Sequence, residues 1–408
     1  KTLNGRTERQ LVLDAEGKWE VVSKPDWCTL STMSGEKKTE LTLTIDAGSE
    51  SREGEIVFKL DEYDYTTTCR VAQYYYEHEE DEEITLQTHS RGKGINLVFL
   101  GDGFDAENIS NGDYLRVMNE QMERFFDIEP YHTYRDYFNV STAIAVSPES
   151  GIGTVNTIRN TKFETTFTGE VGLRGNYSTI FNYAMEVSPV DESNLNQSLI
   201  IVTPNTIDYG GITEMWTDGS AIAFCPLSED SYPYDARGII QHEAGGHGFG
   251  KLGDEYIYHN TFIDFCDCTC CEHVFEFNIA KSLGWYENLS LTGKMHEVPW
   301  SHLIFDDRYS DVVDIYEGGF MHARGVFRSE QNSCMNNNIS YYNAISREAI
   351  VKRIMEYAGE SYSFEKFVEN DKRDAVNSLS RSAERPGVTV RGNQYAPRIH
   401  KGKPDILK

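Results

Sequence analysis

Residues 242–256 read HEAGGHGFGKLGDEY, a stretch that places two histidines five residues apart on an expected helix. Glu243 directly follows the first of them, His242, and the second is His247. On a regular α-helix, residues four apart lie about 40° from each other and residues five apart about 140°. Both imidazoles can face one point only if the helix widens locally, as a π-bulge does. The sequence therefore predicts a helix that is bulged near residues 244–246.

The glycines of this stretch support an unusual backbone. Gly245, Gly246, Gly248 and Gly250 crowd one turn and a half of the expected helix, and each costs a helix interior about 1 kcal/mol relative to alanine. A bulge, a tight helix end or close packing would require them. The upstream DARGIIQ offers Asp235 as the N-cap that begins the helix.

Two histidines and an adjacent glutamate on one helix are the residues with which zinc peptidases bind their metal and handle a water. Catalytic zinc takes three protein ligands and keeps one position for water. The position six residues past the second histidine is Gly253, which has no side chain. We expect Asp254 to be the third zinc ligand, with Glu255 as its main rival and Glu276 as a more distant one. The carboxylate left over would orient a histidine from the second shell.

Composition and order along the chain predict two domains. Short alternating segments such as KWEVVSK, ELTLTIDA and GEIVFKL predict an all-β sandwich over residues 1–76. Cys28 and Cys69 would either pair across it or remain buried thiols. EHEEDEE begins an expected acidic linker over 77–93, and strands mixed with helices predict an α+β (α/β-like) domain over 94–408.

Charge and hydropathy exclude several classes of protein. The formal net charge of −27 argues against nucleic-acid binding, which depends on lysine and arginine. No apolar run reaches the roughly 18 residues of a membrane span. The sequence starts at Lys1 without a leader, which suits a cytosolic protein or a mature exported one. With eight cysteines, we expect export to the periplasm, the cell surface or the medium; a lipid anchor upstream of Lys1 stays open.

The first segment resembles BACON-type sandwich domains, which stand at the N-termini of exported Bacteroidetes enzymes. The likeness rests on Trp19, the WCTLS around Trp27, the LTLTI strand, the REGEI that begins at Arg52, and VAQ at 71–73. Such domains are described as carbohydrate or mucin binders, and a plain spacer is the equal alternative.

The stretch GHGFGKLGDEY resembles the GHxFGxLxDEY core of the IgA-peptidase family of zinc metallopeptidases, with one extra residue between HE and that core. The likeness continues through LVFLGDGF, NTIDYGG and YEGGFMHARGVFRSEQNSCM, across most of residues 95–356. Dipeptidyl-peptidase-III-type enzymes also use HExxxH. The resemblance implies a zincin/metzincin-type domain with His242 and His247 as zinc ligands and Glu243 as general base.

Other residues acquire expected roles from this reading. Met335 resembles the methionine of a metzincin Met-turn, against the alternative of an ordinary core or loop methionine. Tyr256, or else Tyr209, would donate a hydrogen bond to the oxyanion of the tetrahedral intermediate. SAIAFC at 220–225 is placed like the edge strand that aligns substrate in metzincins, although it equally suits a core strand.

The remaining cysteines form a CxCxCC cluster beside His273. A second zinc site and loop disulfides are the two interpretations that we weigh for it. The residues concerned are Cys266, Cys268, Cys270 and Cys271, with Cys225 or Cys334 as further disulfide partners.

Together these features predict an exported zinc-dependent endopeptidase that hydrolyses peptide bonds through a zinc-bound water activated by Glu243. The substrate would be a protein or peptide, with a host glycoprotein as one candidate. The alternative is a non-catalytic surface protein that binds glycans or proteins on a degenerate peptidase scaffold.

Overall fold

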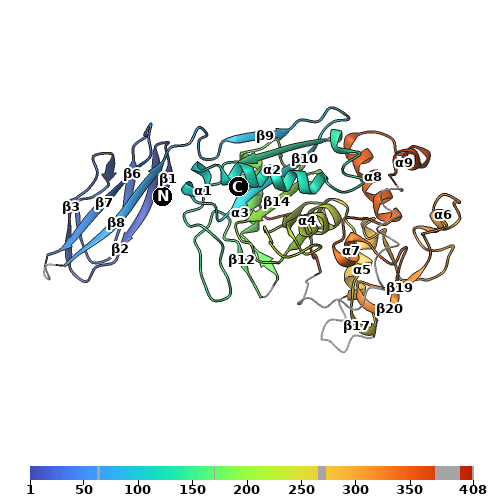
Figure 1. The fold of residues 1–408 in the computed structure, drawn as a ribbon. Coiled ribbons are helices and arrows are strands. Elements are labelled where there is room, and N and C mark those ends of the chain that lie inside the picture. The colour runs from blue at the N-terminus through green and yellow to red at the C-terminus, as the bar shows by residue number, and fades with distance from the viewer. Residues whose placement is uncertain (62–64, 170, 265–272, 373–395, 407–408) are drawn as a thin grey trace.

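The computed structural model describes residues 1–61, 65–169, 171–264, 273–372 and 396–406. Figure 1 shows a small β-domain at the N-terminus beside a larger domain of strands and helices. Within the described ranges, no helix combines the length and the hydropathy required to cross a bilayer.

The small domain is a sandwich of two sheets, with strand orders β1-β8-β7-β3-β5 and β2-β6-β4. Its strands are β1 (Thr2–Leu3), β2 (Thr7–Leu13), β3 (Lys18–Ser23), β4 (Cys28–Leu30), β5 (Ser34–Glu36), β6 (Thr39–Ile45), β7 (Arg52–Leu60) and β8 (Tyr65–Tyr74). Alternate residues of β6 face the core, where Leu41 and Leu43 pack with Trp19. Cys28 and Cys69 both carry free thiols, the first buried and the second half-buried, so of the two alternatives for this pair the disulfide is not made.

Part of the predicted acidic linker belongs to the larger domain as a strand. Residues 83–87, inside the predicted linker 77–93, form strand β9 (Glu83–Gln87), which pairs antiparallel with the larger domain. Ile84 and Leu86 pack against the main core, and Asp81 accepts hydrogen bonds from Lys162 and Tyr183. The alternating apolar residues of EITLQ are typical of an edge strand. The many acidic residues just before them made the segment resemble a solvated linker instead.

A seven-stranded sheet organises the larger domain in the order β21-β15-β16-β14-β10-β11-β9. Its further members are β10 (Ile95–Asp102), β11 (Phe138–Ala143), β14 (Leu199–Pro204), β15 (Ile212–Trp216), β16 (Ala221–Phe224) and β21 (Arg398–His400). Strands β11, β10, β14 and β16 run parallel, whereas β9 and β15 pair antiparallel to their neighbours β11 and β16. The domain is therefore a mixed α/β domain.

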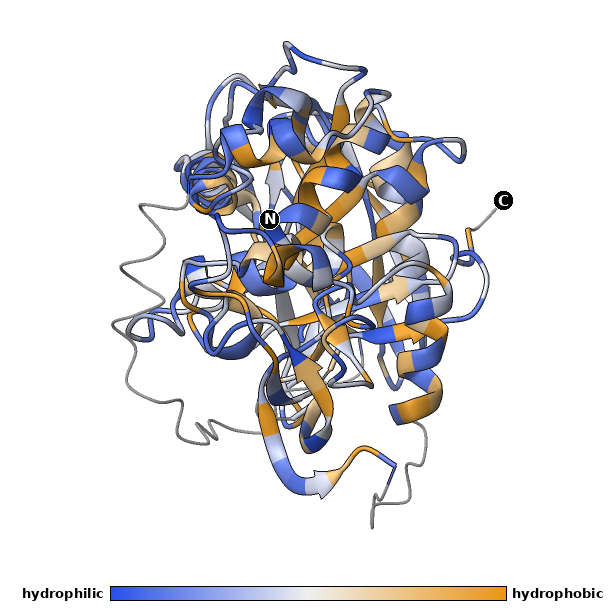
Figure 2. Ribbon diagram, turned by 90° about the vertical axis from the view of Figure 1, so that its right-hand side faces the viewer, coloured by the Kyte–Doolittle hydropathy of each residue, from blue (hydrophilic) through white to orange (hydrophobic). Residues whose placement is uncertain are grey.

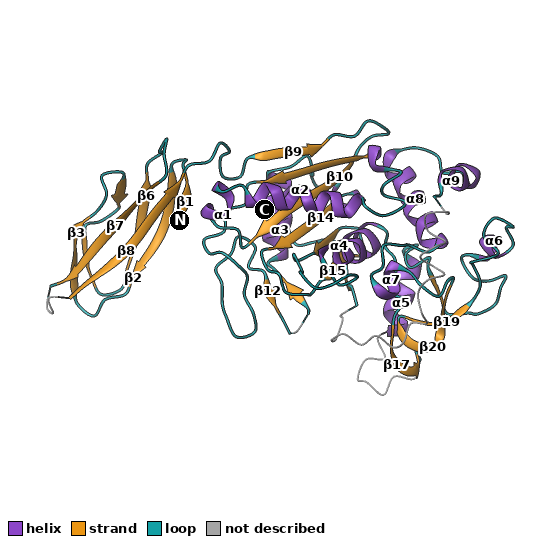
Figure 3. Cartoon of the chain, viewed as in Figure 1, coloured by secondary structure: helices purple, strands orange, loops and turns teal. Residues whose placement is uncertain are grey.

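Helices surround this sheet (Figure 3). They are α1 (Ala106–Ser110), α2 (Asp113–Phe126), α3 (Tyr177–Glu186), α4 (Ala236–Ile240), α5 (His273–Ser282), α6 (Ser301–Ile304), α7 (Cys334–Asn337), α8 (Ala344–Ala358) and α9 (Phe364–Asn370), with 3₁₀ turns at Arg135–Tyr137 and Leu195–Gln197. Figure 2 shows hydrophobic residues concentrated on the interior strands and on one side of the helices, as expected for a layered core.

Two smaller sheets complete the domain. One is the pair β12 (Thr166–Phe167) and β13 (Leu173–Arg174); the other joins β17 (Ile257–Phe262), β18 (Leu289–Ser290), β19 (Tyr316–Gly319) and β20 (Met321–Arg328). The second sheet follows directly after the DEY of the opening motif, so the chain leaves that motif as an extended strand.

The expected substrate-aligning edge strand at 220–225 is wrong. These residues form β16, which is fully buried and lies between β14 and β15 in the interior of the sheet. A strand with neighbours on both sides has no free edge for a peptide. Of the two readings of SAIAFC, the structure shows the core strand.

Candidate metal centre

The helix that carries the histidines is a π-helix over Gln241–Phe249 that continues α4. It begins as expected, since the side chain of Asp235 accepts a hydrogen bond from the backbone of Gly238. The backbone N–H of Gly250 donates to the carbonyl of Gly245 at 3.0 Å, a bond across five residues. The predicted bulge is thus confirmed, and it extends beyond residues 244–246.

Close packing explains three of the glycines. A Cβ at Gly245 would lie 2.5 Å from the hydroxyl of Tyr342, and one at Gly248 would lie 2.8 Å from Cδ1 of Leu199. A Cβ at Gly246 would overlap the side chain of Met335. The π-helix is therefore clamped on several sides, and side chains at these positions would force it away from its neighbours.

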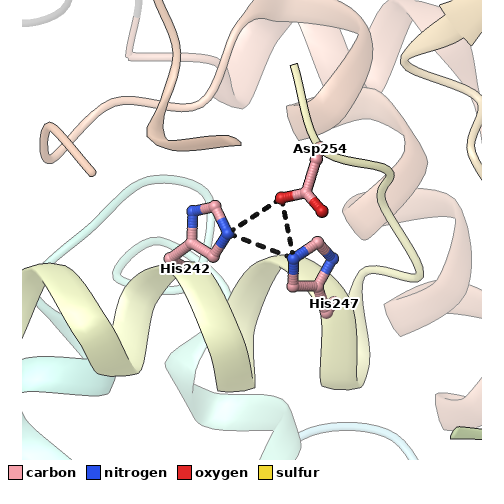
Figure 4. Close-up of side chains that lie close together, drawn as sticks. All are labelled: His242, His247 and Asp254. Carbon is pink, nitrogen blue, oxygen red and sulfur yellow. Dashed lines mark hydrogen bonds and ion pairs between the residues drawn. The ribbon is translucent and has the colours of Figure 1, made fainter. Parts of the chain in front are cut away.

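The widened turn brings three ligand atoms to one place (Figure 4). The Nε2 atoms of His242 and His247 lie 3.1 Å apart, and each lies 3.2 Å from Oδ1 of Asp254. Zinc ligands at about 2.0–2.1 Å in a tetrahedron would be about 3.3 Å from one another. All three side chains are buried. Among the described residues, this is the only group of three such side chains whose ligand atoms converge within 4.8 Å.

The donor set of this cluster fits a cation. Nδ1 of His242 lies 2.9 Å from the carbonyl oxygen of Cys334, and Nδ1 of His247 lies 2.8 Å from that of Leu252. A carbonyl only accepts, so each Nδ1 carries a proton, and in the neutral rings both Nε2 atoms offer lone pairs beside the carboxylate. Such a group requires a positive charge at its centre.

The pKa values of the cluster residues also indicate that the centre of the cluster requires a positive charge. Burial disfavours a charged imidazole, but the hydrogen bond and charge of Asp254, together with Glu243, raise the pKa of His242 to about 9. Burial alone would raise the pKa of Asp254, yet the two imidazoles hold it well below its usual range. Without a metal, a proton therefore occupies the centre, and metal binding would release it.

The structure separates the two neighbouring acids. Asp254 faces the histidines, whereas Oε1 of Glu255 accepts hydrogen bonds from the amides of Asn288 and Asn343, each at 2.8 Å. Burial raises the pKa of Glu255 to about 7. Glu276 lies on α5, outside the cluster. The histidines are oriented by backbone carbonyls, so the expectation that the spare carboxylate orients them is wrong.

Glu243 lines a pocket beside the cluster, together with His242, Tyr209, Tyr256 and the Gly210-Gly211 turn. The hydroxyl of Thr213 on β15 lies 2.8 Å from Oε2 of Glu243 and donates to it. Burial raises the pKa of Glu243, which suits a group that takes up and returns a proton.

Both candidate oxyanion donors line this pocket. The ring of Tyr256 lies nearly parallel to that of His242, with centroids 6.3 Å apart, whereas Tyr209 packs edge-on against Tyr234. Burial, followed by the charge of Asp254, raises the pKa of Tyr256 well above its usual value. Its phenol therefore stays protonated and able to donate.

Met335 is fully buried and packs beneath the π-helix at Gly246, between the two histidines in sequence. Its carbonyl accepts a hydrogen bond from the backbone of Glu255 at 2.7 Å, and the preceding carbonyl, of Cys334, holds His242. The turn at residues 334–335 thus contacts both His242 on the π-helix and Glu255 after it, as a Met-turn would.

Two residues at or next to the pocket were not anticipated from the sequence. Thr213 holds the carboxylate of Glu243, and Asn338, in a left-handed conformation at the end of α7, lines the pocket from the far side. Thr213 lies two residues after the end of NTIDYGG, a segment already assigned to the resemblance, so its position was the available signal. Nothing in the NNN of 336–338 distinguished Asn338.

The cluster of cysteines at 266–271 lies outside the described residues. Cys225 and Cys334, considered as partners for it, carry free buried thiols. His273, next to the cluster in sequence, begins α5.

The fold and the centre define a two-part protein: a β-sandwich followed by an α/β domain with a His-His-Asp cluster of the metallopeptidase kind. Residues 84–280 match the family model described as IgA Peptidase M64, and residues 17–73 match BACON, a putative N-terminal binding domain. Both resemblances are thereby confirmed. Residues 84–280 are thus similar to the M64 peptidases, a family of metallopeptidases.

Other comparisons add little. No curated protein matches the chain. Among solved structures, a Bacteroides ovatus GH5 xyloglucanase in complex with a XXXG heptasaccharide is 18% identical over 26% of this chain and 25% of that chain, with a TM-score of 0.19. The match thus spans about a quarter of that structure's chain, and a likeness this low carries no argument about fold or activity.

Proposed function

We propose that the protein is a zinc-dependent endopeptidase of the zincin type, with its active site in the pocket beside His242. The observation that carries this proposal is the convergence of two imidazole nitrogens and one carboxylate oxygen within about 3.2 Å, next to a pocket-lining glutamate. The family match of residues 84–280 supports a peptidase.

His242, His247 and Asp254 would hold the zinc. When bound, zinc polarises a peptide carbonyl and lowers the pKa of water. Two neutral imidazoles and one carboxylate form a ligand set that zinc accepts readily. The backbone carbonyls of Cys334 and Leu252 fix the tautomer and orientation of both rings.

Glu243 acts as the general base. It accepts a proton from the attacking water and then passes that proton to the leaving amine, so that one carboxylate serves both halves of the reaction. Thr213 holds one carboxylate oxygen and leaves the other free for this transfer. The tight approach of Gly211 to the side chain of Glu243 further restricts its rotamers.

Tyr256 donates a hydrogen bond to the oxygen that becomes negative in the tetrahedral intermediate. Its place in the pocket, beside the ring of His242, supports this role. Proteins or peptides are the substrates. The BACON match of residues 17–73 supports export and an N-terminal domain that holds the enzyme at a target or surface.

The test combines metal analysis with cleavage of a peptide library. We expect one zinc at the His242 centre and cleavage that Glu243→Gln abolishes while the zinc is retained. Glu186→Gln, a change of the same kind at an exposed position on α3, serves as the matched control and should cleave normally. Zinc-free wild-type protein that cleaves no peptide would favour the alternative of a binding protein on an inactive scaffold. Undiminished cleavage by Glu243→Gln would instead overturn the role of Glu243 as general base.

A further inference from the structure

Three histidines gather in the sheet that follows the active-site motif. His259 lies on β17, His322 on β20 and His273 at the start of α5. Strands β17 and β20 pair in parallel with His259 opposite His322. Three elements that are far apart in sequence thus each bring one imidazole to this part of the sheet, and the proposed reaction uses none of them.

The closest pair has the geometry of the histidines at the first centre. Nδ1 of His273 lies 2.9 Å from Nε2 of His322, compared with 3.1 Å between the Nε2 atoms of His242 and His247. The ring planes make angles of 71° and 81° in the two pairs, with centroids 5.2 Å and 4.7 Å apart. In both pairs the ring edges converge on one point.

His322 is prepared to offer a lone pair. Its side chain is fully buried, and its Nδ1 lies 3.2 Å from the hydroxyl of Thr261. This hydroxyl can accept a hydrogen bond from the Nδ1–H, which leaves Nε2 with its lone pair directed towards His273. A neutral buried imidazole whose other nitrogen is hydrogen-bonded is the usual form of a histidine ligand.

We propose that His322 and His273, joined by His259, form a second transition-metal site of the zinc class. Imidazole nitrogen suits zinc, copper and nickel. The exposed side chain of His259 has its ring 5.7 Å from that of His322 and completes the site by rotation about its side-chain bonds. The hydroxyl of Thr261, within hydrogen-bond distance of Nδ1, fixes the orientation of the His322 ring.

The metal would tie α5 to the β17–β20 pair. Strand β17 begins at Ile257, directly after Tyr256, and the backbone of Met321 donates to the carbonyl of Tyr256. Metal affinity adds to folding stability when the unfolded chain lacks the site. Binding at this site would therefore stabilise the strands that hold Tyr256 in the pocket.

Zinc stoichiometry of the full chain tests this inference. Protein stripped with a chelator and titrated with zinc should bind two equivalents. His322→Ala and His242→Ala should each bind one, and the double variant none. A wild type that binds one equivalent, or a His322→Ala variant that still binds two, overturns the second site. Because the readout is binding rather than cleavage, it is independent of the proposed peptidase activity.

Because His322 is buried, variants at the two less buried histidines, His273 and His259, give a second test that does not depend on the folding of His322→Ala. In the His242→Ala background, zinc should raise the melting temperature, and adding His273→Ala or His259→Ala should abolish that rise. His132→Ala removes an exposed histidine, whose side chain is 70% accessible, and should leave the rise intact. A rise that survives both His273→Ala and His259→Ala contradicts the proposal.

Discussion

Replacing Thr213 by valine removes the hydroxyl that contacts the proposed general base, at both its carboxylate and its backbone carbonyl. The hydroxyl lies 2.8 Å from Oε2 of Glu243, and a hydrogen bond to a charged group contributes about 1.5–3 kcal/mol. If the contact holds the carboxylate in its reactive position, its loss should lower kcat about 10- to 150-fold, since about 1.4 kcal/mol corresponds to a factor of ten. KM and zinc content should stay unchanged, because the residue touches neither substrate nor the ligand atoms.

Two further variants make the measurement specific. Thr213→Ser keeps the hydroxyl and should recover most of kcat. Thr203→Val, on β14, replaces another fully buried threonine whose hydroxyl has no hydrogen-bond partner within the described ranges, and it should leave kcat unchanged. Steady-state kinetics on a peptide selected from the library, with metal analysis of each variant, give the comparison. Full kcat in Thr213→Val, or equal losses in the valine and serine variants, would refute the positioning role.

Three other changes test the ligand set and the packing. Asp254→Ala should weaken zinc binding by more than about 100-fold in a chelator competition, whereas Glu255→Gln, which can still accept from its two asparagines, should not; the reverse order would exchange their roles. Asp371→Ala leaves the 2% exposed Arg347 without its partner and should lower the free energy of unfolding by about 3–5 kcal/mol in urea; a loss below about 1 kcal/mol would contradict this. Gly246→Ala places a Cβ 2.8 Å from Cε of the methionine beneath it and should cost about 1–3 kcal/mol by thermal denaturation; a gain would show that the methionine moves freely.

The helix and its distortion were predictable because their signals are local. The spacing of His242 and His247 requires a wider turn wherever the two share a ligand, and the glycines mark the same residues. The alternation of ELTLTIDA likewise predicted β6 of the sandwich. Each of these features depends on residues within one turn or one strand of each other.

The choice between Asp254 and Glu255 was not predictable for the opposite reason. Asp254 and Glu255 lie in the irregular segment between the π-helix and β17, where no regular periodicity assigns a side chain to one face. Which of the two acids faces the histidines is set by distant segments: the backbone of Glu255 donates to Met335, and the carbonyl of Asp254 accepts from Phe320. The place of β16 inside the sheet is likewise set by β14 and β15, and no local pattern records strand order.

The extra residue in the motif is tolerated through tertiary contacts as well as through the π-helix itself. Two fully buried tyrosines reach the widened helix: Tyr131 donates to the carbonyl of Gly245 at 2.6 Å, and Tyr342 donates to that of Gln241. Buried carbonyls without partners are costly, and a widened turn disturbs the regular helical pairing that would otherwise satisfy them. Glycine at 245 leaves room for both phenols. The glycines and the tyrosines therefore act together, and the bulged helix is stable only in this surrounding.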